Sequence, residues 1–223
     1  GAVNVAPGFA PAPVPGALAG PEFALLGEAF AQAHDRALTR SVPGEPATHV
    51  LVTFGTRDSA DRTTVALDAL ARLAPKPRVT VVIGGAAAHR AKVEAAVSDT
   101  TGARLIIDAQ NMIPIYQQAD FAIGAPGVSL LERLCCGLPG MILCQNPNQT
   151  AIARAAAASG AVVLSEAEDA QALVDDIAPL LADGTRRAEL RTRGLALIDG
   201  RGARRLAEAL IAARAAWARE AVP

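Results

Sequence analysis

Aromatic residues are scarce in this chain: they make up 3% of its 223 residues, whereas 51% of the residues are hydrophobic. The core must therefore be built from alanine, valine, leucine and isoleucine, and such small side chains favour close packing of helices on a sheet. Cysteine is also rare, with three residues, two of them adjacent at Cys135 and Cys136. An odd number without regular spacing is a poor disulfide framework, so we expect thiols that pack as small hydrophobic groups in a reducing compartment.

Other absences narrow the function. The chain has 21 Lys and Arg against 22 Asp and Glu, so its charge balance does not indicate nucleic acid or an anionic membrane surface as a partner. No cysteine or histidine pair has the spacing of a zinc site, and we expect neither a metal nor a cofactor. No apolar run is long enough to cross a bilayer, and the start has no basic signal-peptide segment. These observations favour the cytoplasm.

Isolated histidines and clustered arginines have structural interpretations. His34, His49 and His89 have no serine, cysteine or carboxylate arrangement that suggests a triad, so we expect structural or surface roles and no catalytic residue here. Seven arginines recur at helical spacing near the end of the chain, and the pattern favours a solvated helix face over a basic binding surface. They are Arg186, Arg187, Arg191, Arg193, Arg201, Arg204 and Arg205.

The chain divides into two parts by composition. Residues 1–21 contain five prolines and no periodic pattern, which predicts an interdomain linker. Residues 22–223 are predicted to form one domain, which begins with a helix over 22–38 and ends with three helices. Between them, short apolar segments alternate with helical periodicity. The six segments predicted as strands are residues 48–54, 78–83, 104–107, 120–123, 140–144 and 161–164.

Short, nearly all-apolar strands separated by helices predict a parallel sheet covered on both faces. The expected fold class is therefore α/β, a Rossmann-like, doubly wound parallel sheet of about six strands. Ligands of such sheets bind beyond the carboxyl ends of the strands, so the loops that follow the strands are the segments to inspect. A G-x-G-x-x-G dinucleotide fingerprint is absent.

The most informative segment runs from Ala119 through Arg133. It predicts a buried strand, a glycine turn and a helix that opens on a small hydroxyl residue. In one interpretation, backbone N–H groups of Gly127, Val128 and Ser129 face a phosphate, and Glu132 accepts hydrogen bonds from a ribose. In the other, Ser129-Leu130-Leu131-Glu132 is a capping box, with Glu132 reaching back to the Ser129 N–H. The two interpretations place the Glu132 carboxylate differently.

Three further loops contain candidate ligand contacts. Arg57 follows the first strand of the sheet and is placed to reach a diphosphate or sugar, whereas the neighbouring Asp58 suits an N-cap. Asn111 and Met112, with Ala109, either terminate a strand or lie beside a base edge. Asn148 and Gln149 open a helix on the crevice side, where Asn148 is either an N-cap or, with Gln149, a contact to sugar or phosphate.

These blocks, in this order, resemble the nucleotide-sugar hydrolase family of the pseudaminic acid pathway (PseG or SpsG type). The resemblance covers about residues 17–165. The matching blocks are Gly20-Pro21-x-Phe23-Ala24-Leu25-Leu26, Val52-Thr53-Phe54-Gly55-x-x-Asp58, Asn111-Met112, residues 119–125, Glu132-Arg133, Cys135, Gly137-Leu138-Pro139 and Asn148-Gln149. That family cleaves UDP-2,4-diacetamido-2,4,6-trideoxy-β-L-altropyranose to the free sugar and UDP.

The resemblance implies the C-terminal, UDP-holding half of a glycosyltransferase GT-B fold. By that resemblance Gly127, Val128 and Ser129 face the diphosphate and Glu132 faces the ribose. The segment with Ala109, Asn111 and Met112 would lie beside the uracil, and Arg57, Asn148 and Gln149 would lie on the sugar and phosphate side. The family's catalytic histidine lies in an N-terminal domain with no counterpart here, so the expected partners are UDP or a UDP-sugar and a missing N-terminal domain of the same protein.

The chain also departs from the family pattern. Thr56 replaces a second glycine, Val128 replaces a serine, Leu131 replaces a tryptophan and Gly27 replaces an arginine. Two alternatives to the hydrolase therefore stay open. One is a GT-B glycosyltransferase similar to the family that adds N-acetylglucosamine in peptidoglycan assembly. The other is a degenerate module that binds a nucleotide sugar without catalysis.

Overall fold

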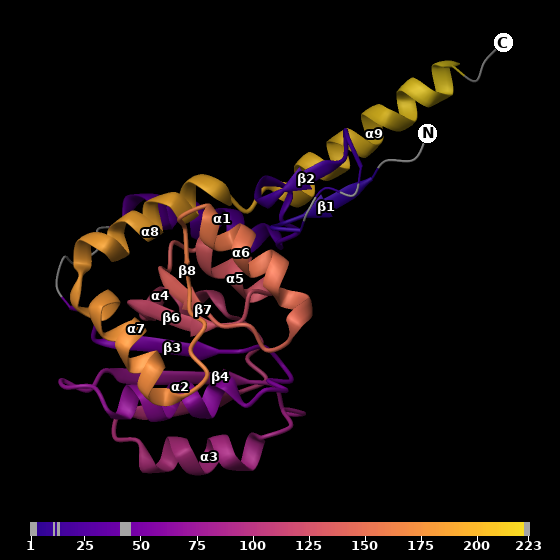
Figure 1. Cartoon of the computed structure of the whole chain (residues 1–223). Helices are drawn as coiled ribbons and strands as arrows, with labels where there is room; N and C mark the ends of the chain where they lie inside the picture. The colour runs from indigo at the N-terminus through magenta and orange to yellow at the C-terminus, as the bar shows by residue number, and fades with distance from the viewer. Residues whose placement is uncertain (1–3, 11, 13, 41–45, 221–223) are drawn as a thin grey trace.

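The computed structural model describes residues 4–10, 12, 14–40 and 46–220, the last four of these by their backbone alone. Its centre is a parallel six-stranded sheet with the order β5-β4-β3-β6-β7-β8 (Figure 1). The predicted α/β class and the six predicted strands are confirmed. The strands are β3 (His49–Thr53), β4 (Arg78–Ile83), β5 (Ala103–Ile107), β6 (Phe121–Gly124), β7 (Gly140–Ile142) and β8 (Val163–Leu164).

The two central strands, β3 and β6, mark the point where the strand order reverses. Thr53 at the end of β3 pairs with Gly124 at the end of β6. From β3 the chain moves outward through β4 and β5, then returns to β6 and moves outward on the other side. The loops that follow β3 and β6 therefore leave in opposite directions, which is the geometry that opens a ligand crevice in doubly wound sheets.

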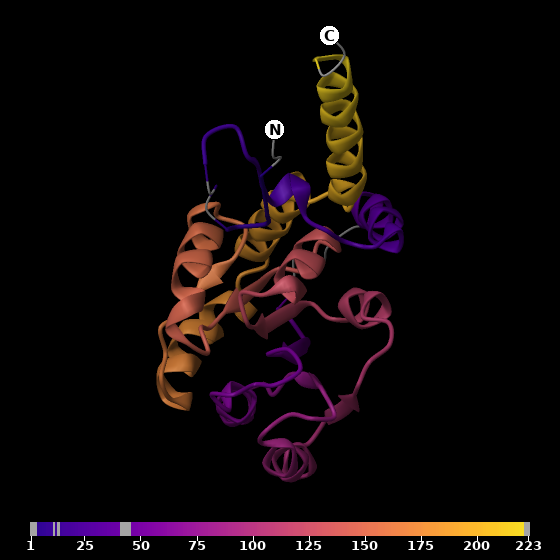
Figure 2. The same cartoon turned by 90° about the vertical axis from the view of Figure 1, so that its right-hand side faces the viewer.

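Alternate residues of the buried strands supply two separate packing surfaces. Val50 and Val52 face one side, which is covered by α2 (Arg62–Ala71), α3 (Arg90–Asp99) and α7 (Ala170–Ala182). Leu51 faces the other side. Figure 2 shows α7 on one side of the sheet and α4 on the other. The helices of that second side are α1 (Glu28–Thr39), α4 (Ile113–Gln118), α5 (Val128–Cys135) and α6 (Thr150–Ala158).

The segment predicted as a linker contains two short paired strands. β1 (Val5–Pro7) and β2 (Leu18–Gly20) run parallel to each other, and the 3-10 turn η1 (Pro21–Phe23) follows directly. Residues 1–3, 11 and 13 of this segment lie outside the described residues. The β1–β2 pair and α9 (Gly202–Glu220), which follows α8 (Gly184–Leu197), lie at the same end of the molecule, beyond the sheet (Figures 1 and 2). The division at residue 21 stays a prediction.

The helix predicted over residues 22–38 is wrong in its first six residues, because α1 begins only at Glu28. Ala24 and Leu26 are buried at 1% and 5% exposure in the chain between η1 and α1. A Cβ on Gly202 would lie 2.4 Å from the Ala24 carbonyl oxygen, so α9 packs directly against this segment. The apolar spacing that suggested one helix therefore comes from a non-helical segment, which contains the buried Ala24 and Leu26, followed by α1.

Candidate functional site

A cavity of about 420 Å³ lies at the carboxyl ends of β3, β4 and β5, where ligands of parallel sheets bind. Its volume falls in the usual range for small-molecule sites, which is roughly 300–1,000 Å³. The loops after the strands and the helices α4 and α5 line it. The lining residues are Thr53, Gly55, Thr56, Val82, Ile83, Gly84, Asp108, Ala109, Gln110, Met112, Tyr116, Ser129 and Glu132.

The turn between β6 and α5 leaves the start of the helix open. Gly127 is the N-cap residue, its backbone is extended, and no side chain caps the helix. Val128 at the first helical position is 63% exposed. Because the first N–H groups of an α-helix have no intrahelical partner and carry partial positive charge, this end of α5 can accept an anion.

Glu132 turns away from its own helix terminus. Its Oε2 accepts a hydrogen bond of 2.6 Å from the Tyr116 hydroxyl of α4, and its side chain lines the cavity together with Ser129. The capping-box interpretation is therefore wrong: Ser129 is not the N-cap, and Glu132 does not reach back to the Ser129 N–H. The carboxylate is left for the cavity.

A buried guanidinium lies behind the turn. Arg133 is 1% exposed, and it donates from Nε to the Ser129 carbonyl at 3.1 Å and from Nη2 to the Ala125 carbonyl at 3.2 Å. Burial lowers the pKa of Arg133 to about 10, so the group remains charged at neutral pH. Its bonds occupy carbonyl oxygens of the turn, and its charge favours an anion at the open helix end.

Burial also raises the pKa of Glu132 above its usual value, because desolvation disfavours the charged form. The Tyr116 hydrogen bond and the Arg133 charge act in the opposite direction. Burial raises the pKa of Tyr116 strongly as well, so its hydroxyl stays protonated and remains a donor. The pair therefore consists of a Tyr116 hydroxyl that always donates and a Glu132 carboxylate whose raised pKa makes its charge sensitive to pH and to nearby groups.

The predicted base-side residues divide into two groups. Ala109 and Met112 line the cavity, whereas Asn111 is exposed and its Oδ1 accepts a 3.1 Å hydrogen bond from the Ile113 N–H at the start of α4. Asp108 was missed by sequence reasoning. Its backbone has a positive φ of 51°, and its Oδ1 accepts from the Gly85 N–H at 2.7 Å, which joins the loops after β4 and β5.

The predicted sugar-side residues do not line this cavity. Arg57 is exposed on the loop after β3, while Asp58 is buried and its carboxylate accepts from the N–H groups of Arg62 and Thr63 at the start of α2, both at 2.9 Å. The N-cap role expected for Asp58 is therefore wrong in its position, because the N-cap of α2 is Asp61, although the Asp58 carboxylate does accept from the first N–H groups of that helix.

The helix expected to open at Asn148 and Gln149 starts as the 3-10 turn η2 (Pro147–Gln149) and continues as α6. The N-cap role considered for Asn148 is wrong, since the N-cap of η2 is Asn146 and neither η2 nor α6 has a side-chain cap. The Gln149 Oε1 accepts from the Gln145 N–H at 2.7 Å.

Tyr116 is a second functional candidate that the sequence alone did not reveal. It lies 1% exposed in α4, and its partner Glu132 is sixteen residues further along, in another helix. One signal was available: this is the only tyrosine of the chain, and it stands four residues after Met112.

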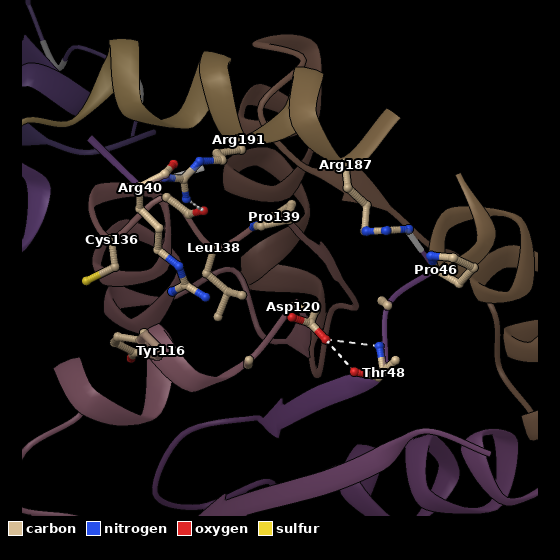
Figure 3. A pocket seen from close by; sticks show the side chains of 13 residues that line it. Arg40, Pro46, Thr48, Tyr116, Asp120, Cys136, Leu138, Pro139, Arg187 and Arg191 are labelled. Carbon is tan, nitrogen blue, oxygen red and sulfur yellow. Dashed lines mark hydrogen bonds between the residues drawn. The ribbon is translucent and has the colours of Figure 1, made fainter. Parts of the chain in front are cut away.

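A second, smaller cavity of about 120 Å³ lies at the opposite, amino-terminal edge of the sheet (Figure 3). Arg40, Arg187 and Arg191 line it, and Asp120 accepts there from the Thr48 N–H at 2.9 Å and the Thr48 hydroxyl at 3.1 Å. All three guanidinium groups donate to backbone carbonyls, so the chain itself uses these cations.

The prediction of a solvated arginine face is therefore wrong for two of the seven residues. Arg187 is only 2% exposed and donates to the carbonyls of Leu180 and Leu181 near the end of α7. Arg191 donates to the carbonyl of Gly137 at 2.6 Å and to that of Ala37 near the end of α1. The last carbonyls of a helix have no intrahelical donor, which is why these arginines are drawn inward.

Arg191→Met is expected to destabilise the fold by about 2–4 kcal/mol, because it leaves several partly buried carbonyls without a charged donor. The free energy of unfolding from urea titration measures this loss. Arg193→Met is the matched control on the same helix: Arg193 is exposed, and its loss should change stability by about 0.5 kcal/mol at most. Equal stability of the two variants would contradict the role given to Arg191.

The remaining candidates behave as structural groups. His49 is buried, with Nδ1 2.7 Å from the Gln118 carbonyl and Nε2 2.7 Å from the Thr80 hydroxyl. Cys135 and Cys136 are buried, and desolvation raises the pKa of each thiol to about 12. Among the described residues, no group of three or more histidine, cysteine or acidic side chains could hold a metal ion, and no helix is long and apolar enough to cross a membrane.

Comparison with known proteins gives one curated relative of significant similarity in sequence. The chain is 28% identical over 189 residues to SpsG of Bacillus subtilis, a spore coat polysaccharide biosynthesis protein. The match covers 82% of this chain but only 54% of that protein, so the chain spans about half the length of its relative. No family model matches the chain.

Solved structures share the fold at low sequence identity. HepE of Anabaena, solved with UDP-glucose, has a TM-score of 0.59 at 15% identity, with 83% of this chain and 53% of that chain covered. MurG of Acinetobacter baumannii has a TM-score of 0.57 at 15% identity, with 84% and 55% covered. The C-terminal domain of the glycosyl transferase group 1 family protein LpcC of Francisella tularensis has a TM-score of 0.51 at 19% identity, with 78% and 93% covered. The chain therefore has the Rossmann-like fold of GT-B C-terminal domains and is homologous to SpsG.

Proposed function

We propose that this chain is the UDP-binding domain of an enzyme that acts on a nucleotide sugar in surface polysaccharide biosynthesis. The observation that carries the proposal is the placement of Glu132. The Tyr116 hydroxyl holds this carboxylate in the cavity at the carboxyl edge of the sheet, beside the open N-terminus of α5. A diphosphate at the helix end and a ribose at the carboxylate would together account for both features.

The proposed contacts follow from that arrangement. The backbone of Gly127, Val128 and Ser129 would receive the diphosphate, with the buried Arg133 charge behind it. Glu132 would accept hydrogen bonds from the ribose hydroxyls. Ala109 and Met112 line the part of the cavity proposed for the uracil. The sugar or phosphate would meet the remaining candidates only where the ligand extends beyond this cavity. These candidates are Arg57, Asn148 and Gln149.

The preferred reaction is hydrolysis of a UDP-linked deoxyamino sugar, as the resemblance of the sequence blocks implies. The name of the B. subtilis relative and the UDP-glucose bound to HepE support a nucleotide sugar in polysaccharide synthesis. The water-activating histidine would belong to a partner N-terminal domain of the same protein, and the enzyme would work in the cytoplasm. The structures of HepE and MurG leave room for a further domain, because the chain covers only 53% and 55% of them.

A glycosyltransferase is the second candidate, since the fold is shared with the C-terminal domain of LpcC, a glycosyl transferase group 1 family protein. The two reactions differ in the acceptor, which is water in one and a hydroxyl-bearing molecule in the other. Incubation of the two-domain protein with a UDP-sugar decides between them: free sugar and UDP without an added acceptor support hydrolysis. Release of UDP only when an acceptor is added, with the sugar transferred to it, supports the transferase.

UDP binding by the chain alone is the first test. Isothermal titration calorimetry is expected to detect binding of UDP, weaker binding of UMP, and weaker still of uridine, because the phosphates contribute through the helix end. Circular dichroism on the same sample establishes that the protein is folded. A folded chain that shows no heat of binding at millimolar UDP would contradict the proposal and favour a module that has lost nucleotide binding.

A further inference from the structure

Tyr116 and Glu132 form a buried contact that joins two helices on the same side of the sheet. Tyr116 belongs to α4, which follows the loop at the proposed base side, and Glu132 belongs to α5, which follows the proposed phosphate turn. The hydroxyl donates to Oε2 at 2.6 Å. In the part of the chain that the structure describes, this hydroxyl is the one hydrogen-bond donor that reaches the Glu132 carboxylate.

We propose that Tyr116 is a positioning residue of the nucleotide site, which holds Oε2 of Glu132 in place so that Oε1 accepts hydrogen bonds from the ribose hydroxyls. This inference rests on the proposed function and adds a residue to it. Tyr116 lines the cavity but is only 1% exposed, and its hydroxyl already donates to Glu132, so we expect it to act through that carboxylate.

Two physical effects follow from the contact. First, it fixes a long, flexible side chain before the ligand arrives, which removes part of the entropy cost of ordering that side chain on binding. Second, the hydroxyl hydrogen bond favours the ionised carboxylate, against the desolvation that raises the pKa of Glu132. Glu132 must be ionised if Oε2 is to accept from Tyr116 while Oε1 accepts from the ribose, because only the ionised carboxylate accepts freely at both oxygens.

The charged and titratable groups around Glu132 are few. Tyr116 faces it from α4, and Arg133 and Cys136 are its neighbours along α5 and its C-terminal end. Asp108 lines the same cavity from the loop after β5, and the lining residues from β3, β4 and the loops after them carry no charge. Removal of the Tyr116 hydroxyl therefore removes the neutral side chain that donates to Glu132 and leaves the charged side chains of the site in place.

Tyr116→Phe is expected to weaken UDP binding about 3- to 10-fold near pH 8, because the Glu132 side chain is then no longer held and must be ordered when the ligand binds. The sign of the pH effect is set by Glu132. Without the hydroxyl the pKa of Glu132 rises further, so the fall in UDP affinity on acidification begins at a higher pH than in the wild type. Titration calorimetry from about pH 5.5 to 8.5 measures this shift, and the ligand's own phosphate ionisation is common to all variants.

The ligand 2′-deoxy-UDP separates positioning from packing. The wild type is expected to prefer UDP over 2′-deoxy-UDP about 3- to 10-fold, because one ribose hydroxyl is missing from the weaker ligand. In Tyr116→Phe this preference should fall to about twofold or less, since a loosely held carboxylate discriminates poorly. Glu132→Gln should lose the preference for UDP over 2′-deoxy-UDP, and it should also lose the fall in UDP affinity that follows from protonation of Glu132. The double variant with Tyr116→Phe added should behave like Glu132→Gln alone in both measurements.

Thr80→Val is the matched control. It removes another buried hydroxyl, and Thr80 is 1% exposed like Tyr116. The Thr80 hydroxyl lies toward the opposite edge of the sheet, where it accepts a 2.8 Å hydrogen bond from Arg104 Nε. It should lower thermal stability and leave the UDP preference and the pH profile unchanged.

The outcomes distinguish the inference from the function on which it rests. If the wild type does not bind UDP, both are overturned. If the wild type binds UDP but Tyr116→Phe loses affinity equally for both ligands at every pH, the function survives and Tyr116 only packs. Should Tyr116→Phe fail to fold, Glu132→Gln with an unchanged UDP preference would still overturn the inference.

Discussion

Glu132→Ala is expected to raise the Kd for UDP about 10- to 100-fold, because hydrogen bonds to a charged group contribute roughly 1.5–3 kcal/mol. The carboxylate lines the cavity, and burial raises its pKa above the usual value. The affinity of the wild type should therefore fall as the pH decreases through that raised pKa, because protonation removes the acceptor. The variant should lose this component of the pH dependence. Titration calorimetry with UDP at several pH values measures both effects.

Asp176→Ala is the control for Glu132→Ala. Asp176 also accepts from a hydroxyl at 2.6 Å, that of Ser165, but it lies outside the candidate cavity. Its loss should leave UDP affinity within about twofold of the wild type. If Glu132→Ala binds UDP as tightly as the wild type while remaining folded, the ribose contact does not exist, and a degenerate module becomes the better interpretation.

Gly124→Ala is expected to destabilise the fold by about 3 kcal/mol or more, since overpacking of a rigid core is costly. Gly124 ends β6 beside the last residue of β3. A Cβ there would lie 2.3 Å from the backbone oxygen of Thr53 and 3.3 Å from Nη2 of Arg133. The central strand pair would have to separate at the point where the loops of the site begin. UDP affinity should fall with stability, because the phosphate turn starts at this residue.

Thermal unfolding checks this prediction. For a chain of this size, 3 kcal/mol corresponds to a decrease in Tm of about 6–12 °C. Gly27→Ala is the control, because nothing lies within 4 Å of an added Cβ there and its backbone is already extended. It should cost about 1 kcal/mol at most. A Gly124→Ala protein with the stability of the control would show that β3 and β6 are less closely packed than the structure has them.

The sheet could be predicted from the sequence because its signals are local. Each strand is a short apolar run that ends at a glycine, a polar residue or a loop, and all six predicted strands are present with boundaries within two residues. Regular alternation with helices requires crossover connections, and these fix parallel pairing and the edge at which ligands bind. The loops to inspect for a site could therefore be predicted as well.

The burial of individual polar residues could not be predicted in the same way. Arg187 and Arg191 have the spacing of an exposed face, yet they lie inward because the carbonyls at the ends of α7 and α1 need donors. Residues 24–27 of the predicted helix over 22–38 are not helical, and α9, nearly 180 residues further on, packs against this segment at Ala24. Both outcomes depend on partners that local periodicity does not contain.

By itself, the sequence determined the α/β class, the six strands and the turn at Gly127 with a carboxylate one helical turn beyond. The tertiary structure alone decided what that carboxylate does. Ser129 and Glu132 have the spacing of a capping box, and only the packing of α4 beside α5 supplies the Tyr116 hydroxyl that holds Glu132 in the cavity instead. Local spacing allows either contact, and the crossover through β6 settles which donor is within reach.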